Sequence, residues 1–342
     1  MWAVAELPGL DLDALRTWLD AEHPGLRRGP LRAEVIAGGK SNLTYRVSDD
    51  VTTWALRRPP LAHVLPTAHD MAREFRVVSA LAGTDVPVAA AVALCTDTSV
   101  LGAVFYLMAY VDGVVLDRPE QIQRLDPPGA RRACEQLIDT LVALHRVEPE
   151  AAGLADFGRP EGFLARQVRR WFGQWQASVT EPRPGLDALV ARLEATVPDQ
   201  SAAAIVHGDY RLTNVMFHPD LSGIAAVVDW EMATLGDPLT DVGLLVVYQT
   251  LSVDDDFVMP LMSPAAGFLT PDQMVERYAR GSDRDLSHLD WYVGFGYFKL
   301  AVVAEGIHRR YLQGKTVGTG FDHFGAAVPK LLDAASAALA DR

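Results

Sequence analysis

Cysteine and long apolar runs are both scarce in this sequence. Only Cys95 and Cys134 occur among the 342 residues, and two isolated thiols give neither a disulfide framework nor the paired spacing of a zinc site. Such cysteine usage is typical of a reducing compartment. The most apolar stretch, residues 291–304, contains Lys299 and is shorter than the about 20 residues of a membrane-spanning helix. We therefore expect a buried helix there and no membrane anchor.

Excess positive charge is absent as well. The chain has 31 Lys and Arg against 44 Asp and Glu, a formal net charge of −13, and no basic cluster with interleaved aromatics. Nucleic acid and anionic membrane surfaces are therefore not expected as partners. The chain does not open with a basic segment followed by an apolar one, so no secretory signal is predicted and a cytoplasmic location is expected.

A Walker A nucleotide-binding loop is missing too. Residues 39–41 have its Gly-Lys-Ser ending, but Glu34 stands where its first glycine is required. The loop lies between two predicted strands, residues 33–37 and 43–47, and its small residues would let backbone amides approach a phosphate. Ser41 is the candidate phosphate contact in this loop. A plain hairpin turn is the alternative.

Four polar residues stand at fixed spacing in residues 206–231. His207 precedes Asp209 by two positions, Asn214 follows Asp209 by five, and Asp229 follows Asn214 by fifteen. The apolar runs on either side of residues 220–223 predict a β-hairpin. Asn214 would enter one strand and Asp229 would end the other, so both should lie at the same end of the ribbon.

These residue types suit phosphoryl transfer, in which catalysis is mostly positioning and neutralisation of phosphate charge. The amide oxygen of Asn214 and the carboxylate of Asp229 are hard ligands of the kind that Mg²⁺ prefers. The carboxylate of Asp209 can accept the proton of a substrate hydroxyl. The alternative is structural: His207 and Asp209 would cap turns, and Asp229 would cap a helix.

The spacing resembles the kinase catalytic loop and metal-binding Asp, with His-Gly-Asp for His-Arg-Asp and Asp-Trp-Glu for Asp-Phe-Gly. This variant resembles the aminoglycoside phosphotransferase and choline kinase branch of the kinase-like fold. The resemblance implies an α+β bilobal protein with a small antiparallel sheet and one key helix, then a larger, mostly helical lobe. We expect the ATP-binding lobe in residues 1–110, with a leading helix at 10–22, and the catalytic lobe in residues 111–342.

The same resemblance assigns residues in the first lobe. Residues 54–57, Trp-Ala-Leu-Arg, stand where kinases carry Val-Ala-Ile-Lys, which implies that Arg57 touches the ATP phosphates. Strand alternation puts Arg57 and Arg58 on opposite faces, and Arg57 is the choice while Arg58 stays open. Glu74, on a predicted helix at 69–81, is the candidate partner of Arg57, with an exposed helical Glu as the alternative.

Further residues follow along the chain. Two strands at 91–95 and 104–109 lead to a hinge, where the backbone of Met108 to Val111 could bind adenine. Asp237 before Pro238 predicts a helix start. Asp241 lies one turn later, and the resemblance implies that it braces the catalytic loop, with plain stabilisation of the helix dipole as the alternative. His207 would support the same loop.

The second lobe should be helical. Apolar periodicity predicts helices near residues 129–146, 163–179, 271–280, 291–313 and 321–340. Residues 248–270 are expected to be a loop-bearing insertion whose acidic run at 254–256 is solvated. The arginines of the helix at 163–179 could face an anionic substrate such as a CoA ester, or they could form a solvated edge.

We therefore predict an ATP- and Mg²⁺-dependent kinase that phosphorylates a hydroxyl of a small molecule. Asp-Trp-Glu at 229–231 together with Leu-Gly-Asp-Pro at 235–238 resembles phosphotransferases found near, or fused to, acyl-CoA dehydrogenases, which implies a hydroxyacyl-CoA-like acceptor. An aminoglycoside or another antibiotic is the alternative acceptor. A nucleotide-binding pseudokinase or scaffold without transfer activity is the alternative of another class. The sequence leaves the oligomeric state and the choice of ATP or GTP open.

Overall fold

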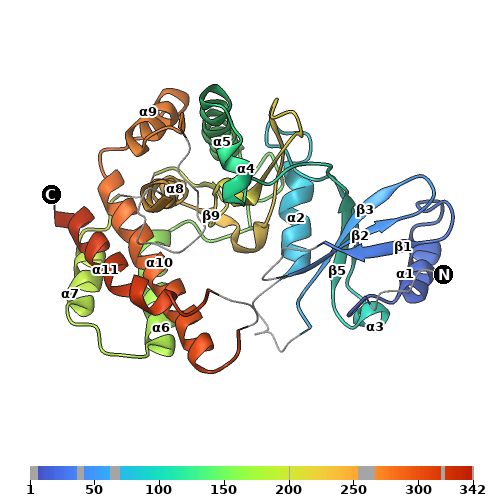
Figure 1. Cartoon of the computed structure of the whole chain (residues 1–342), viewed down its shortest axis with the longest axis horizontal. Coiled ribbons are helices and arrows are strands. Elements are labelled where there is room, and N and C mark those ends of the chain that lie inside the picture. The colour runs from blue at the N-terminus through green and yellow to red at the C-terminus, as the bar shows by residue number, and fades with distance from the viewer. Residues whose placement is uncertain are drawn as a thin grey trace. The chain divides into compact units, whose positions relative to one another are not determined.

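The computed structural model describes residues 7–36, 42–61, 70–199, 201–252, 266–316 and 320–340 (Figure 1). The chain divides into two compact units: Met1–Gly113 with Ala225–Ala233, and Val114–Ile224 with Thr234–Arg342. Ser41 and the acidic run at 254–256 lie outside the described residues. The assignment of residues 1–110 to an ATP-binding lobe and of residues 111–342 to a catalytic lobe stays a prediction.

The first unit is built on a five-stranded sheet in the order β1-β2-β3-β5-β4. Every neighbouring pair is antiparallel, as the resemblance implied. The strands are β1 (Arg32–Val35), β2 (Leu43–Ser48), β3 (Thr53–Arg58), β4 (Ala91–Cys95) and β5 (Phe105–Ala109). The helices are α1 (Leu12–Glu22), α2 (Met71–Leu81) and α3 (Thr98–Leu101), and the 3-10 helix η2 (Trp230–Met232) belongs to the same unit.

Strand alternation assigns the two faces of this sheet. Phe105 and Leu107 belong to the apolar core that also contains Leu15 and Leu19 of α1. Tyr106, between them in the strand, faces the opposite way and packs edge-on against Phe75 of α2, with ring centroids 5.9 Å apart. Each fully buried Leu contributes on the order of 1.5–3 kcal/mol, so the core under α1 holds the sheet rigid while its other face carries polar groups.

The second unit is largely helical. Its helices are α4 (Pro119–Gln123), α5 (Pro127–Arg146), α6 (Phe163–Ser178), α7 (Leu186–Ala195), α8 (Leu239–Ser252), α9 (Pro271–Gly281), α10 (Leu289–Leu312) and α11 (Phe324–Ala340). Helix α10 packs against α6, α8 and α11. Within α10, most residues from Trp291 to Glu305 are buried, so the apolar stretch is a core helix, as expected. Within the described residues no helix is long and apolar enough to cross a membrane.

Two short sheets carry the loop with the candidate catalytic residues. Strand β6 (Ala204–Val206) pairs antiparallel with β9 (Thr234–Gly236). Strand β7 (Val215–Phe217) pairs with β8 (Ile224–Val227), which confirms the predicted hairpin. Its turn is closed by the bond from His218 N to Gly223 O at 2.9 Å. The 3-10 helix η1 (Leu212–Asn214) leads directly into β7.

Several predicted helix boundaries differ from those in the structure. Helix α5 begins at Pro127 rather than near residue 129, because the Asp126 side chain accepts the N–H of Gly129 at 2.8 Å and caps the helix there. Helix α11 begins at Phe324 instead of Phe321. Helix α7 was not predicted at all. Helix α8 continues to Ser252, so residues 248–252 are helical and do not belong to the predicted loop-bearing insertion.

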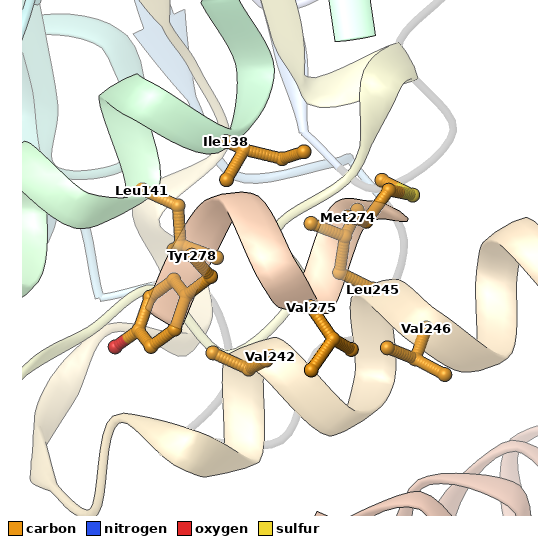
Figure 2. A pocket seen from close by; sticks show the side chains of 8 residues that line it. All are labelled: Ile138, Leu141, Val242, Leu245, Val246, Met274, Val275 and Tyr278. Atoms are coloured by element: carbon orange, nitrogen blue, oxygen red, sulfur yellow. The ribbon is translucent and has the colours of Figure 1, made fainter. Parts of the chain in front are cut away.

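A small apolar pocket lies among α5, α8 and α9 of the second unit (Figure 2). Its lining residues are Ile138, Leu141, Val242, Leu245, Val246, Met274, Val275 and Tyr278. None of these side chains carries a charge, and the only polar atom among them, the Tyr278 hydroxyl, is bonded to His145. The pocket is therefore a gap in helix packing and has no groups suited to a substrate or an ion.

Candidate catalytic loop and phosphate-binding network

The candidate base, Asp209, lies in the loop between β6 and η1 of the second unit. Asn214 holds it from within the loop: the Asn214 amide nitrogen donates to the Asp209 carbonyl oxygen at 2.8 Å and to Oδ2 at 3.0 Å. The loop is therefore closed on itself by the five-residue spacing that the sequence shows. Since the amide nitrogen is used in this way, the amide oxygen is the atom of Asn214 suited to a cation.

Two residues that sequence reasoning missed also bind the Asp209 carboxylate. The Tyr248 hydroxyl on α8 donates to Oδ1 at 2.5 Å, and Nε of Arg211 lies 3.3 Å from Oδ2. The Arg211 guanidinium also lies over the Tyr248 ring, 5.4 Å from its centroid. Arg211 lies within the same sequence motif, and a cation two positions after Asp209 is a signal that could have identified it. Nothing in the sequence pattern brings Tyr248 to this loop.

The backbone of the loop is held by Asp241. Its Oδ2 accepts the N–H of His207 at 2.7 Å, and its Oδ1 accepts the N–H of Gly208 at 2.8 Å. The His207 ring in turn accepts the N–H of Asp209 through Nδ1 at 3.2 Å. His207 and Asp241 are both buried. The candidate residues of this unit are thus brought together in one hydrogen-bonded loop.

A buried histidine extends this network into the helices. Nε2 of His145 on α5 lies 3.4 Å from Oδ2 of Asp241, and Nδ1 lies 2.9 Å from the Tyr278 hydroxyl on α9. Burial works against the Asp241 charge, but His145, His207 and the loop amide together hold its pKa below the usual range. Burial lowers the pKa of His145, more than the nearby Asp241 raises it, so the ring is neutral at pH 7.

Lys299 binds the carbonyl of Gly208, the residue whose N–H is bound by Asp241. Its ammonium group, on α10, donates to the Gly208 carbonyl and lies 5.2 Å from the centre of the Trp171 ring on α6. Burial lowers the pKa of Lys299, whereas the charges of Asp209 and Asp241 raise it. The sequence showed Lys299 only as an interruption of an apolar helix.

Arg57 and Glu74 meet on the α2 side of the sheet in the first unit. Nε of Arg57 donates to Oε2 of Glu74 at 2.8 Å, and Nη2 of Arg57 donates to Oδ1 of Asp229 at 2.6 Å. Glu74 is 1% exposed, so the alternative of a solvated helical Glu is excluded. Burial opposes the Arg57 charge, but the surrounding acids raise the pKa of its guanidinium. Burial also raises the pKa of Glu74, and Arg57 offsets part of that rise.

Asn42 and Tyr106 complete this polar network. The Asn42 amide nitrogen donates to Glu74 at 3.2 Å and to Glu231 at 3.1 Å. The Tyr106 hydroxyl donates to Oε2 of Glu74 at 3.2 Å. Asn42 directly follows the predicted phosphate loop, and it shares the Glu74 carboxylate with Arg57. The sequence drew attention to Asp229 but not to the contact that Glu231 makes.

Asp229 has a backbone conformation that most residues avoid. Its φ of 67° and ψ of 59° are left-handed, a region in which Asp and Asn are the commonest residues other than Gly. Asp229 directly precedes η2, whose Trp230 side chain donates to the Val227 carbonyl at 3.0 Å. The turn after β8 therefore fixes the direction of the Asp229 carboxylate. A left-handed residue maintained by its surroundings is a feature common at functional sites.

Arg58 and the hinge residues have other surroundings. The Arg58 guanidinium donates to the carbonyls of Leu101, at 2.9 Å, and Gly9, so it braces the α1 side of the sheet, away from Glu74. Met108 lies in β5, paired with Ala55 of β3. The N–H groups of the next two residues, Ala109 and Tyr110, donate to backbone carbonyls. Val111 follows them, within the first unit.

The candidate residues therefore form two groups. Arg57, Glu74 and Asp229 are brought together in the first unit, and His207, Asp209, Asn214 and Asp241 are brought together in the second. Among the residues that the structure describes, no three His, Cys, Asp or Glu side chains form a cluster suited to a metal ion. A divalent ion would thus need the amide oxygen of Asn214 or oxygens from phosphate as further ligands, which is the donor set that Mg²⁺ uses beside nucleotides.

A small antiparallel sheet with a buried Arg–Glu pair, and a helical unit with an Asp-and-Asn loop, define the kinase-like class of phosphotransferases. The fold is shared with a solved structure: a thermostable mutant of aminoglycoside phosphotransferase APH(4)-Ia, in a ternary complex with AMP-PNP and hygromycin B, superposes with a TM-score of 0.60 at 14% identity, over 96% of this chain and 100% of that one. The chain belongs to the Phosphotransferase enzyme family (APH), whose model matches residues 32–282.

Two further similarities are higher. A candidate aminoglycoside phosphotransferase from Ralstonia eutropha JMP134 has a TM-score of 0.83 and 32% identity, over 97% of this chain and 98% of that one. Acyl-CoA dehydrogenase family member 10 of Mus musculus is 32% identical over 315 residues, which are 89% of this chain and 29% of that protein. The chain spans between 29% and 43% of the lengths of this protein and of the family member 11 proteins that it also matches.

Proposed function

We propose that the protein transfers the γ-phosphate of ATP to a hydroxyl of a small molecule, with Asp209 as the base. One observation carries this proposal: the Asp209 carboxylate is held by Asn214 and the loop backbone is held by the buried Asp241, in a chain of the phosphotransferase family. A loop that only capped turns would not need a buried carboxylate that accepts hydrogen bonds from two successive backbone amides. Positioned groups are what phosphoryl transfer requires.

Each residue has a distinct part in the proposed reaction. Asp209 accepts the proton of the acceptor hydroxyl, while His207 and Asp241 keep the loop backbone in place. Arg57, oriented by Glu74, faces the nucleotide phosphates. The backbone near Met108 and Val111 contacts adenine, and Ser41 in the loop before β2 contacts phosphate. Relatives bind nucleotides of this kind, such as the AMP-PNP of the APH(4)-Ia complex.

The ion would be held by Asn214 and Asp229. The Asn214 amide nitrogen is committed to Asp209, which leaves its oxygen for a cation, and Asp229 adds a carboxylate. When bound, Mg²⁺ neutralises charge on the phosphate oxygens. Because Arg57 pairs with Oδ1 of Asp229, Oδ2 of Asp229 is the oxygen suited to the ion.

The acceptor that this loop suits best is anionic. Arg211 forms an ion pair with the Asp209 carboxylate, and the Lys299 ammonium group donates to the Gly208 carbonyl. Cations at this loop would disfavour a polycationic aminoglycoside and favour a phosphate-bearing molecule. A hydroxyacyl-CoA carries such phosphates, and the relative named for acyl-CoA dehydrogenase favours it. An antibiotic acceptor is the second candidate, favoured by the similarity to the Ralstonia protein.

The test is Asp209→Asn in the full chain, with Mg·ATP and a panel of hydroxyacyl-CoAs, amino alcohols, sugars, aminoglycosides and macrolides. Turnover should fall by about 10²–10⁴-fold while ATP affinity stays near that of the wild type. Asp220→Asn is the matched control, because Asp220 is an exposed carboxylate in the turn between β7 and β8 that accepts the N–H of Ser222. Equal turnover in the two variants removes Asp209 from this role.

Mg·ATP binding distinguishes the non-catalytic alternative. A pseudokinase would raise its melting temperature with Mg·ATP yet transfer no phosphate to any acceptor. A scaffold would show no thermal shift. Either result in the wild-type protein contradicts the proposed function.

A further inference from the structure

The Asp209 carboxylate has different neighbours on its two oxygens. An ionised carboxylate offers about four lone-pair positions, two on each oxygen. On Oδ2, the Asn214 amide nitrogen donates at 3.0 Å, and Nε of Arg211 forms an ion pair at 3.3 Å. On Oδ1, the Tyr248 hydroxyl donates at 2.5 Å. Oδ2 is therefore flanked by two nitrogen groups, whereas Oδ1 offers its second lone pair beside the Tyr248 hydroxyl.

Helix α8 explains how Tyr248 reaches this atom. Asp241 and Tyr248 are seven residues apart on α8, which is about two helical turns, so both project from one face. Asp241 holds the backbone of the loop and Tyr248 holds the side chain. Tyr248 is only 3% exposed, and its ring is fixed from the other side by Arg211. Its hydroxyl therefore has little freedom to point elsewhere.

The Tyr248 hydroxyl can act only as a donor toward Asp209. Burial, with the charge of Asp209 adding to it, raises the pKa of Tyr248 well above its ordinary value. The phenol therefore keeps its proton at any physiological pH. Its proton points at Oδ1, while its own lone pairs face away from the carboxylate.

We propose that Tyr248 is a positioning residue that assigns Oδ1 of Asp209 to the acceptor, and that the acceptor oxygen binds next to the Tyr248 hydroxyl. This inference rests on the proposed function. The acceptor O–H proton passes to Oδ1, the acceptor oxygen forms a bond to the γ-phosphorus, the bond from that phosphorus to the β–γ bridging oxygen breaks, and ADP leaves. Tyr248 keeps its own proton throughout. Without it, Oδ2 keeps its contacts with Asn214 and Arg211, but Oδ1 loses the hydroxyl that orients it and the reacting oxygen is placed less precisely.

The first experiment compares Tyr248→Phe with the wild type in the full chain. The probe acceptors are 3-hydroxybutyryl-CoA and water, with Mg·ATP at varied concentration. Turnover should fall by about 10²-fold, as expected for a misplaced reacting group, while the KM for ATP stays within about twofold. In an Asp209→Asn background the Tyr248→Phe change should have no further effect, because the atom that it positions is gone.

Tyr292→Phe is the matched control. The Tyr292 hydroxyl, on α10, donates to the buried Asp237 at 2.9 Å, so this variant also loses a bond between tyrosine and aspartate in the same unit. It should keep wild-type turnover. Equal losses of turnover in Tyr248→Phe and Tyr292→Phe would assign both to general destabilisation and overturn the proposal.

The second measurement does not depend on activity. With 3-fluorotyrosine incorporated at position 248, the ¹⁹F resonance should move when Asp209 is changed to Asn and stay in place when Asp220 is changed to Asn. An unmoved resonance in the Asp209 variant shows that the hydrogen bond is absent and overturns the proposal. Wild-type turnover in Tyr248→Phe overturns it too. An inactive wild-type protein would instead refute the proposed function, and the spectrum alone would then decide whether Tyr248 positions the Asp209 side chain.

Discussion

Asp241→Asn should weaken both the stability of the second unit and the order of the catalytic loop. Each oxygen of Asp241 accepts one backbone amide, from His207 at 2.7 Å and from Gly208 at 2.8 Å. Asn has one oxygen and one NH₂ group, so one of these amides loses its acceptor and faces a donor instead. The side chain is about 1% exposed, so water cannot replace the lost bond.

The expected cost follows from these contacts. A hydrogen bond to a charged group contributes about 1.5–3 kcal/mol, and an unsatisfied buried donor costs a similar amount. Because the two effects overlap, we expect a loss of about 3 kcal/mol in the free energy of unfolding. For a unit of this size the melting temperature should fall by about 6–12 °C.

Urea unfolding at pH 7 and 25 °C measures this change. Asp272→Asn is a suitable control, because Asp272 is an exposed residue in the first turn of α9. The difference in the free energy of unfolding between Asp241→Asn and the wild type should also become smaller at acidic pH. The pKa of Asp241 is lowered below 3.8 in the folded state, so its charge contributes stability above about pH 4 and that stability is lost as the pH falls through the folded-state pKa. An unchanged unfolding midpoint at pH 7 would show that Asp241 does not stabilise the loop backbone.

Two further predictions concern buried ionisable groups. Burial lowers the pKa of His145 below 6.5, so the unfolded chain takes up a proton that the folded chain does not. The free energy of unfolding should therefore decrease as the pH falls from about 6.5 to 5. His145→Gln should make this pH dependence weaker in urea unfolding experiments, and an equal pH dependence in the variant would contradict the role of His145. Arg57→Met leaves Glu74 and Asp229 without their cation and should cost about 3–5 kcal/mol, whereas adding Glu74→Met should recover much of it. Equal unfolding midpoints for the single and double variants would show that Glu74 is not the group left unpaired.

Strand alternation and helical periodicity predicted much of the fold because both depend on neighbouring residues. Alternation placed Arg57 and Arg58 on opposite faces of β3, and the structure has Arg57 at Glu74 while Arg58 bonds to the Leu101 carbonyl. The hairpin of β7 and β8 was also predictable, because its turn residues are local. The α+β class was implied by the resemblance of these motifs to the kinase-like family.

The parts that escaped prediction depend on tertiary contacts. Strands β6 and β9 are three residues each and are separated by 27 residues of chain, so no local pattern marks their pairing. Tyr248 lies 39 residues from Asp209, and the sequence placed it at the start of a loop-bearing insertion rather than on α8. Lys299 lies 91 residues from Gly208 and interrupts an otherwise apolar helix. In each case the side chain acquires its role only when long helices pack beside the loop.

The Gly208 peptide shows why the loop needs such distant support. Gly208 has a φ of 85°, a left-handed conformation that a residue with a β-carbon adopts only with strain, so this position can carry no side chain of its own to hold the loop. Its N–H is bound by Asp241 of α8 and its carbonyl by Lys299 of α10. These two helices pack against each other in the core of the second unit. Movement of the peptide that carries Asp209 would therefore require core helices to shift, and the precision of the base derives from the stability of the helical core rather than from the loop itself.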